Sequence, residues 1–192
     1  MLRMAVMGAH GTGKSTLVSA LARALESPVV TVQGIPRNLM RSGYRFGENL
    51  RLDSVAAYFV EQRRHEIEGR RRGAATLLTE RTLLDAVAYE RANRSMHGRG
   101  CFSADMSAFM ERVAFDHVNT FDRLVYCPIL FPLEDDGVRG GSEEYQQSVD
   151  HELRALVMSD AVDSPVMVVG GTVEQRVAQV LEALGPSAPG EP

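Results

Sequence analysis

The sequence predicts an α/β fold in which a five-stranded parallel sheet is sandwiched between helices. Five short apolar runs are separated by segments with helical periodicity. These runs are continuously apolar, which is typical of strands in a parallel sheet covered on both faces. In addition, the segment GAHGTGKSTL at 8–17 follows the first run directly and fits the pattern G-x-x-x-x-G-K-[ST]. A glycine-rich loop between a strand and a helix is where such a fold binds phosphate.

Each element follows from its local pattern. Thr172 and Gln175 form a capping box that starts the last helix, and apolar residues at helical spacing predict the earlier helices. We expect a single domain over 1–184, a lid at about 131–142 and a flexible tail at 185–192. A mobile loop between helices is predicted at 93–103. The predicted strands are 2–8, 27–34, 74–80, 122–129 and 164–171.

Composition excludes several classes of protein. The chain has 192 residues, 44% of them hydrophobic, and a net charge of −4, so it is neither disordered nor attracted as a whole to nucleic acid or anionic membranes. Its two cysteines, Cys101 and Cys127, form no disulfide framework. No apolar stretch approaches the roughly 18 residues of a membrane helix. We therefore expect a cytoplasmic protein with no nucleic-acid or membrane partner, and a homodimer stays open.

The phosphate loop contains the only lysine of the chain, Lys14, while every other basic residue except histidine is arginine. Lysine carries a compact charge on a thin stem, which enters a tight loop of backbone amides where a guanidinium would clash. We expect Lys14 to bridge the β- and γ-phosphates of ATP and Ser15 to bind Mg²⁺. His10 occupies a position where the pattern accepts any residue, so no role is assigned to it. The predicted nucleotide-binding residues are Gly8, Gly11, Thr12, Gly13, Lys14, Ser15 and Thr16.

Other motifs narrow the class of phosphate-loop protein. The chain lacks the N-K-x-D motif of Ras-like GTPases and the long strand ending in D-E of motor ATPases. Instead, TLLTERTLLDAVAYE at 76–90 resembles the E-R-S or D-R-S segment of nucleoside and nucleoside monophosphate kinases. FDRLVYCPILFPLEDDGVR at 121–139 looks like the fourth strand and lid of nicotinamide-riboside-kinase-like proteins, in an AAA_28-like group. The segment GGTVEQRV at 170–177 is similar to the turn that those proteins place against adenine. The resemblance implies a P-loop NTPase fold of the nucleotide-kinase type.

Charged residues end the third predicted strand. Glu80 at the carboxyl end of a parallel strand points toward the crevice where such sheets bind ligands, and a carboxylate there can hold a Mg²⁺ water. Arg81 beside it can neutralise phosphate oxygens. We therefore predict catalytic roles for both and a metal-binding role for Glu80 with Ser15. Asp85 follows Thr82 by three residues, and the pattern favours a capping-box acid there.

Arg139 is the only arginine in the predicted lid sequence LEDDGVRGGSEEY at 133–145. A kinase must exclude water from the transferred phosphoryl group, and a hinged lid does this while delivering an arginine. We therefore predict that Arg139 is catalytic. The acids of this segment lack the spacing of a calcium-binding loop. The arginines at 70–72 are assigned to a helix C-terminus, where cations meet the helix dipole favourably.

Two classes of function remain open, a small-molecule kinase and a nucleotide-binding switch with slow ATP or GTP hydrolysis. Arg37 after the second strand and Gln62 on the next helix favour the kinase, because a cation and an amide can hold a nucleotide acceptor. Arg81 is the third predicted acceptor-binding residue. Tyr58 or Phe59 would stack on a base, although Phe59 also fits the core.

The acceptor is predicted to be a nucleoside monophosphate. In nucleoside kinases an acid follows the second strand, whereas here no acid lies between Glu26 and Glu48. A monophosphate is already an anionic nucleophile and needs cations rather than a strong base. A nucleoside or ribosylnicotinamide acceptor remains the alternative, because Glu80 or Asp85 could serve as the base.

Overall fold

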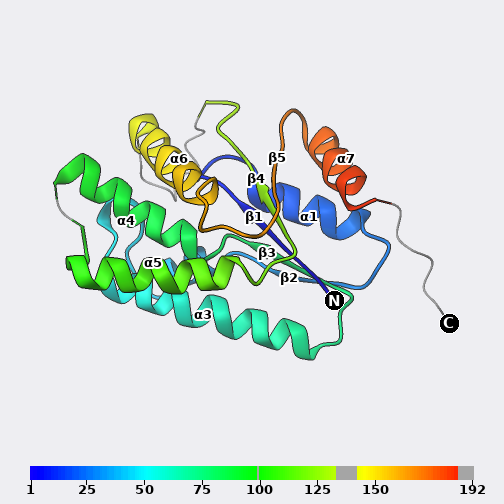
Figure 1. Ribbon diagram of the computed structural model, residues 1–192, viewed down its shortest axis with the longest axis horizontal. Coiled ribbons are helices and arrows are strands. Elements are labelled where there is room, and N and C mark those ends of the chain that lie inside the picture. The colour runs from blue at the N-terminus through cyan, green and yellow to red at the C-terminus, as the bar shows by residue number, and fades with distance from the viewer. Residues whose placement is uncertain (99, 133–141, 186–192) are drawn as a thin grey trace.

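The computed structural model of the protein describes residues 1–98, 100–132 and 142–185 (Figure 1). It contains a five-stranded sheet with the order β2-β3-β1-β4-β5, in which every neighbouring pair is parallel. The predicted sheet is confirmed, and each strand lies within its predicted range. The strands are β1 (Leu2–Met7), β2 (Val29–Val32), β3 (Thr76–Glu80), β4 (Arg123–Tyr126) and β5 (Val166–Val168).

Helices cover both faces of this sheet (Figure 1). A short 3₁₀ helix, η1 (Gly47–Asn49), precedes α3. The capping box predicted at Thr172 and Gln175 is present at the start of the last helix. The helices are α1 (Lys14–Ala24), α2 (Ile35–Arg41), α3 (Leu52–Arg71), α4 (Leu83–His97), α5 (Ala104–Val118), α6 (Glu143–Val157) and α7 (Val173–Leu184).

Alternation along β1 divides the core into two layers. Met4 and Val6 pack with Leu17 and Leu21 of α1 and with Val180 of α7. Ala5 and Met7 point to the opposite face and pack into a larger cluster with residues of α3, α4, α5 and α6. Successive strand residues face opposite sides of a sheet. The continuous apolar runs in the sequence are therefore explained by burial on both sides.

Some predicted boundaries and faces need correction. Helix α2 was not predicted; its Pro36 lies in the first helical turn, where proline is well tolerated. The predicted loop at 93–103 starts too early, since α4 continues to His97. Helical spacing places Val60 on one face with Val55 and Phe59 of α3, but its side chain is 65% exposed. Phe109 has helical spacing with Met106 and Val113 of α5 and is also largely exposed.

The close approach of two strand ends fixes the start of the phosphate loop. The Cys127 amide donates to the carbonyl oxygen of Met7 at 2.8 Å, which extends the pairing of β1 and β4. A Cβ atom at Gly8 would lie 2.4 Å from the Cys127 carbonyl oxygen, and Gly8 has a φ of +148°. Only glycine fits this position. The loop therefore leaves the sheet directly at the carboxyl ends of its central strands.

Arg139 and nearly all of the predicted lid lie outside the described residues, as does the tail after Gly185. Within the described ranges, no helix is long and apolar enough to cross a membrane.

Candidate active site

Lys14 lies at the centre of the phosphate loop, at the start of α1, and is 3% exposed. Its Nζ donates to the Ala9 carbonyl oxygen and to Thr12 Oγ1, the latter at 3.3 Å. No carboxylate among the described residues forms an ion pair with it. Burial, with the nearby positive charge of Arg81, lowers the pKa of Lys14 to about 7. A buried ammonium group in this state is the natural partner of an anion.

Glu80 ends β3 beside this loop and is held from two sides. Ser15 Oγ donates to Glu80 Oε1 at 2.7 Å, and the Gly34 amide donates to Oε2 at 3.2 Å. Burial opposes the ionised form, but Arg81, Ser15 and Lys14 outweigh it, so the pKa of Glu80 lies below its ordinary value. The two predicted metal-binding side chains are therefore in direct contact, and both offer hard oxygen ligands.

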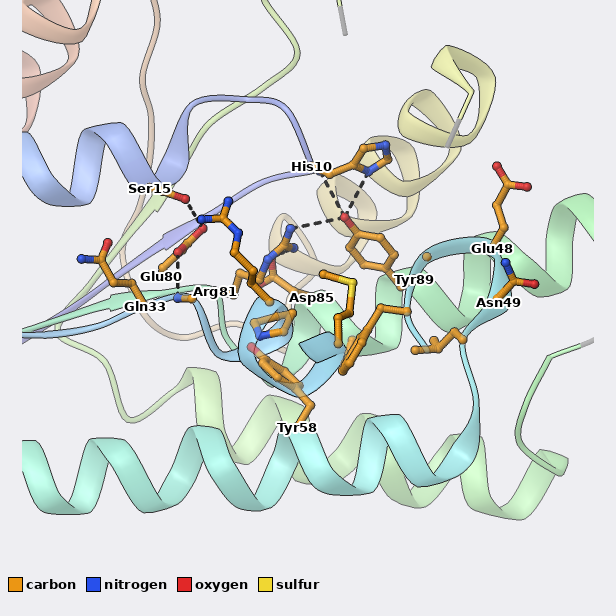
Figure 2. Close-up of a pocket in the computed structure, with 18 of the residues that line it drawn as sticks. His10, Ser15, Gln33, Glu48, Asn49, Tyr58, Glu80, Arg81, Asp85 and Tyr89 are labelled. Atoms are coloured by element: carbon orange, nitrogen blue, oxygen red, sulfur yellow. Dashed lines mark hydrogen bonds and ion pairs between the residues drawn. The ribbon is translucent and has the colours of Figure 1, made fainter. Parts of the chain in front are cut away.

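Arg81 follows Glu80 in a strained backbone conformation. It is the only non-glycine residue with positive φ in the described part of the chain, at +70°. This left-handed region costs an L-residue roughly 1–2 kcal/mol. Such strain persists where the surroundings impose it, and it often marks functional sites. The turn directs the guanidinium away from the sheet and toward the phosphate loop (Figure 2).

Two side chains, Asp85 and Tyr89, fix the guanidinium of Arg81 (Figure 2). Its Nη1 donates to Asp85 Oδ1 at 3.1 Å and its Nη2 to the Tyr89 hydroxyl at 3.3 Å. The same hydroxyl accepts from the His10 amide at 3.1 Å and lies 3.1 Å from His10 Nδ1. Burial alone would lower the pKa of Arg81, but Tyr89, Asp85 and Glu80 raise it above its ordinary value. Arg81 is thus permanently charged and tied to the phosphate loop through Tyr89.

A cavity of about 560 Å³ opens beside these groups. The phosphate-loop end is lined by His10, Ser15 and Glu80, and the far end by residues 47–50 of η1 and its flank. Met40 and Phe46 line it together with Tyr58, whose phenol donates to the Thr82 carbonyl oxygen at 3.0 Å. A cavity of this volume with apolar walls and a few charged groups is typical of a small-molecule site.

The predicted acceptor residues divide into two groups. Arg37 and Arg81 line the cavity, and Arg37 forms no ion pair within the residues that the structure describes. Gln62 does not line it. It is fully buried, and its Nε2 donates to Glu66 Oε1 at 3.0 Å and to the Arg81 carbonyl oxygen at 3.3 Å. The prediction that Gln62 reads a base is wrong, because its amide satisfies groups inside the protein.

Of the two predicted aromatic walls, Tyr58 lines the cavity and Phe59 packs in the core, as its place on the apolar stripe of α3 indicated. Asp85 accepts from the Thr82 amide at 2.7 Å and forms the expected capping box, besides its ion pair with Arg81. Thr12 is buried in the phosphate loop, whereas Thr16 is exposed on the first turn of α1.

Sequence reasoning missed Tyr89 and left His10 unassigned. Asp85 and Tyr89 lie four residues apart on α4, a spacing that brings side chains onto one helical face. That spacing was the available signal for Tyr89. His10 is additionally held by Gln146, whose Nε2 donates to the His10 carbonyl oxygen at 2.6 Å.

The loop, the strand order and the adjoining cavity define a P-loop NTPase fold with a pocket attached to its phosphate loop. The chain matches the family model described as an AAA domain (AAA_28) over residues 3–176, and it belongs to this family. No curated protein gives a significant match.

Three solved structures with a similar fold are those of two kinases. The deoxyadenosine kinase from M. mycoides with bound dATP superposes with a TM-score of 0.73 at 15% identity, covering 97% of this chain and 100% of that one. Its structure with the products dCMP and a flexible dCDP gives 0.71 at 15% identity, with 95% and 98% covered. The thymidylate kinase from Candida albicans gives 0.67 at 15% identity, with 95% and 90% covered. The predicted resemblance to small P-loop kinases is confirmed for the fold.

Replacing Lys14 by methionine should stabilise the ligand-free protein and abolish binding of ATP. Methionine fills a similar volume without a buried charge, and exchanging buried ionic groups for apolar ones of similar volume stabilises proteins by about 1–4 kcal/mol in favourable cases. Urea unfolding measures the first effect and titration calorimetry with MgATP the second. A variant that binds ATP like the wild type would remove Lys14 from the site.

Replacing Arg81 by glycine should cost less stability than replacing it by alanine. Both variants lose the guanidinium, but only glycine adopts a φ of +70° without strain. We expect the glycine variant to be more stable by about 1 kcal/mol. Equal free energies of unfolding in urea would show that the turn relaxes without cost.

Proposed function

We propose that the protein is an ATP-dependent kinase that transfers a phosphoryl group to a nucleoside monophosphate or a similar small nucleotide. The observation that carries this proposal is the cavity of about 560 Å³ that opens beside Ser15, Glu80 and Arg81. A phosphate donor held by the loop and an acceptor held in this cavity would meet at Arg81. The structurally similar deoxyadenosine and thymidylate kinases support the same function.

The residues of the loop suit the phosphates of ATP. Lys14 is a buried cation without an ion-pair partner in the described ranges. The N-terminus of α1 adds a positive partial charge and free amides. Arg176 of α7 donates through Nη1 to the Thr12 carbonyl oxygen at 2.9 Å, and its guanidinium lies 5.5 Å from the centre of the Phe131 ring. Phe131 is exposed and Arg176 is buried, so the Phe131 ring beside Gly13 would offer a surface for the nucleobase of the donor, next to the turn at 170–177.

Ser15 and Glu80 would hold Mg²⁺. No group of three or more acidic, cysteine or histidine side chains in the described residues could bind a metal alone. This fits Mg²⁺, which is commonly held by one or two protein oxygens and the phosphates of its substrate. The ion would supply charge neutralisation between the β- and γ-phosphates.

Arg81 would act on the transferred phosphoryl group. Its charge is permanent, and Asp85 and Tyr89 keep the guanidinium in one orientation. Phosphoryl transfer depends mainly on positioning and on stabilising charge, so a preorganised cation contributes directly to the rate. Arg139 of the predicted lid would add a second cation.

The composition of the cavity favours a phosphorylated acceptor. Gln33 occupies the place after β2 where nucleoside kinases carry an acid, and it lines the cavity with Arg37. Glu80 and Asp85 are both engaged with other groups. Arg37 forms no ion pair within the described ranges, so its charge can bind an incoming anion. A nucleoside or ribosylnicotinamide acceptor would need one of these two carboxylates as its base. A nucleotide-binding switch would need no such cavity.

The acceptor assignment predicts a preference for 5′-monophosphates over matched nucleosides. With MgATP, kcat/KM should be higher for the monophosphate in each pair, and Arg37→Ala should raise its KM about 10- to 100-fold, as expected for a lost charge-assisted hydrogen bond. The KM for ATP should not change. Mass spectrometry of the products counts the phosphoryl groups gained.

Arg41→Ala is the matched control, because Arg41 lies on the last turn of the same helix and does not line the cavity. A preference for the nucleoside, or a monophosphate preference unaffected by Arg37→Ala, contradicts the assignment. ATP binding without phosphorylation of any acceptor would favour the switch.

A further inference from the structure

A buried acid lies behind the cavity and takes no part in its wall. The carboxylate of Glu66 on α3 is fully buried and receives hydrogen bonds from three side chains. Gln62 Nε2 donates to Oε1 at 3.0 Å, and Arg63 Nη1 donates to Oε2 at 2.7 Å. His117 Nε2 of α5 lies 3.0 Å from both oxygens. Arg3 Nη2 is 3.9 Å from Oε2. None of these side chains lines the cavity at the phosphate loop.

Two partners of Glu66 also hold the backbone of the Arg81 turn. Gln62 Nε2 donates to the Arg81 carbonyl oxygen at 3.3 Å, and the Leu83 amide donates to His117 Nδ1 at 3.3 Å. The next carbonyl oxygen, of Thr82, accepts from the Tyr58 hydroxyl at 3.0 Å. Side chains of α3 and α5 therefore satisfy the peptide groups on the far side of the turn from the cavity.

The proton positions in this cluster follow from the hydrogen bonds. Because the Leu83 amide donates to His117 Nδ1, that nitrogen carries no proton, and Nε2 carries the proton donated to Glu66. Burial lowers the pKa of His117 more than Glu66 raises it, which keeps the ring neutral. Burial opposes the charge on Glu66, but His117, Gln62 and Arg63 outweigh it and lower its pKa. A carboxylate accepts from all these donors, whereas an amide would direct its own N–H groups at some of them.

The conformation of Arg81 needs such support. Arg81 has a positive φ that only glycine adopts freely, so its turn relaxes unless the surroundings hold it. Its own amide donates to the Val6 carbonyl oxygen at 2.9 Å, which fixes the side of the turn that faces the sheet. The side that faces α3 and α5 is fixed by Gln62 and His117, and both are oriented by Glu66.

We propose that Glu66 is a positioning residue for Arg81, acting through Gln62 and His117 to hold the strained turn that aims the guanidinium at the transferred phosphoryl group. The catalytic part of this statement rests on the proposed kinase function. The structural part, that Glu66 fixes the Arg81 turn, does not depend on it.

The first test is a double-mutant cycle. Glu66→Gln should lower kcat roughly 10-fold or more while KM for ATP stays within about twofold, because a misdirected Arg81 affects the transition state rather than the binding of ATP. In the Arg81→Ala background, Glu66→Gln should cause no further loss, since residues that act through one another are not additive. An additive loss would overturn the proposal, because it would mean that Glu66 acts independently of Arg81.

Glu68→Gln is the matched control, since Glu68 lies on the same helix in an exposed ion pair with Arg64. It should leave kcat unchanged. Gln62→Met is a second variant that keeps the Glu66 carboxylate and removes the side-chain donor shared by Glu66 Oε1 and the Arg81 carbonyl oxygen. It should also lower kcat, and it should have no effect in the Arg81→Ala background. This second variant keeps the test decisive if Glu66→Gln does not fold.

A second measurement separates this proposal from the kinase assignment. If the wild type phosphorylates no acceptor, the kinase function fails, and amide hydrogen exchange then decides on Glu66. Glu66→Gln should speed exchange of the Leu83 amide about 10-fold or more relative to the amides of β4, whereas Glu68→Gln should not. Unchanged protection at Leu83, or equal acceleration throughout the sheet, would reduce Glu66 to a general stabilising role and overturn the proposal.

Discussion

The site is arranged around a buried ammonium group that has no ion-pair partner among the described residues. Lys14 is nearly inaccessible, and burial lowers its pKa to about 7. Such burial disfavours the charged form in the ligand-free protein, and a multivalent anion reverses this by surrounding the ammonium with negative oxygens. The tight loop that buries Lys14 in turn requires Gly8, because the end of β4 passes directly beside it. The approach of the strand ends therefore fixes both the turn at Gly8 and the burial of the ammonium group that would bind the anion.

The nearby acids do not neutralise Lys14 because each is already held elsewhere. Glu80 is bound by Ser15 and the Gly34 amide, and Asp85 by Arg81 and the Thr82 amide.

Two stripes of side chains meet at the Arg81 turn. On α3, Tyr58, Gln62 and Glu66 follow at four-residue spacing behind the Arg81 turn, and Asp85 and Tyr89 continue the same spacing from Arg81 along α4. The first stripe holds the backbone, and the second holds the guanidinium.

The sequence predicted the sheet, the phosphate loop and the place of Glu80 and Arg81 at the ligand crevice, because each has a local pattern. A joint role of Ser15 and Glu80 was also predicted, because the carboxyl ends of parallel strands face the ligand crevice, although the strand order itself has no local pattern. Gln62 was misassigned because an amide on a helix suits a nucleobase and a buried backbone carbonyl equally well. Only burial separates the two, and burial follows from packing. The strain at Arg81 was also invisible, since no glycine marks the turn.

The glutamine after β2 also bears on the proposed acceptor. Gln33 lies near the Gly34 amide, which donates to Glu80, so an acid at position 33 would add a negative charge close to a carboxylate already committed to the phosphate site. A neutral side chain avoids that repulsion but gives up a base at this position. A kinase can do without a base at position 33 only where the nucleophile is already ionised or another base is close. Asp85 is unsuited as a base while it holds Arg81, because taking a proton would release the guanidinium on which the proposed transfer depends. An ionised acceptor needs neither an acid at position 33 nor proton uptake by Asp85. The charge of Arg37, which has no ion pair among the described residues, complements the charge of such an acceptor.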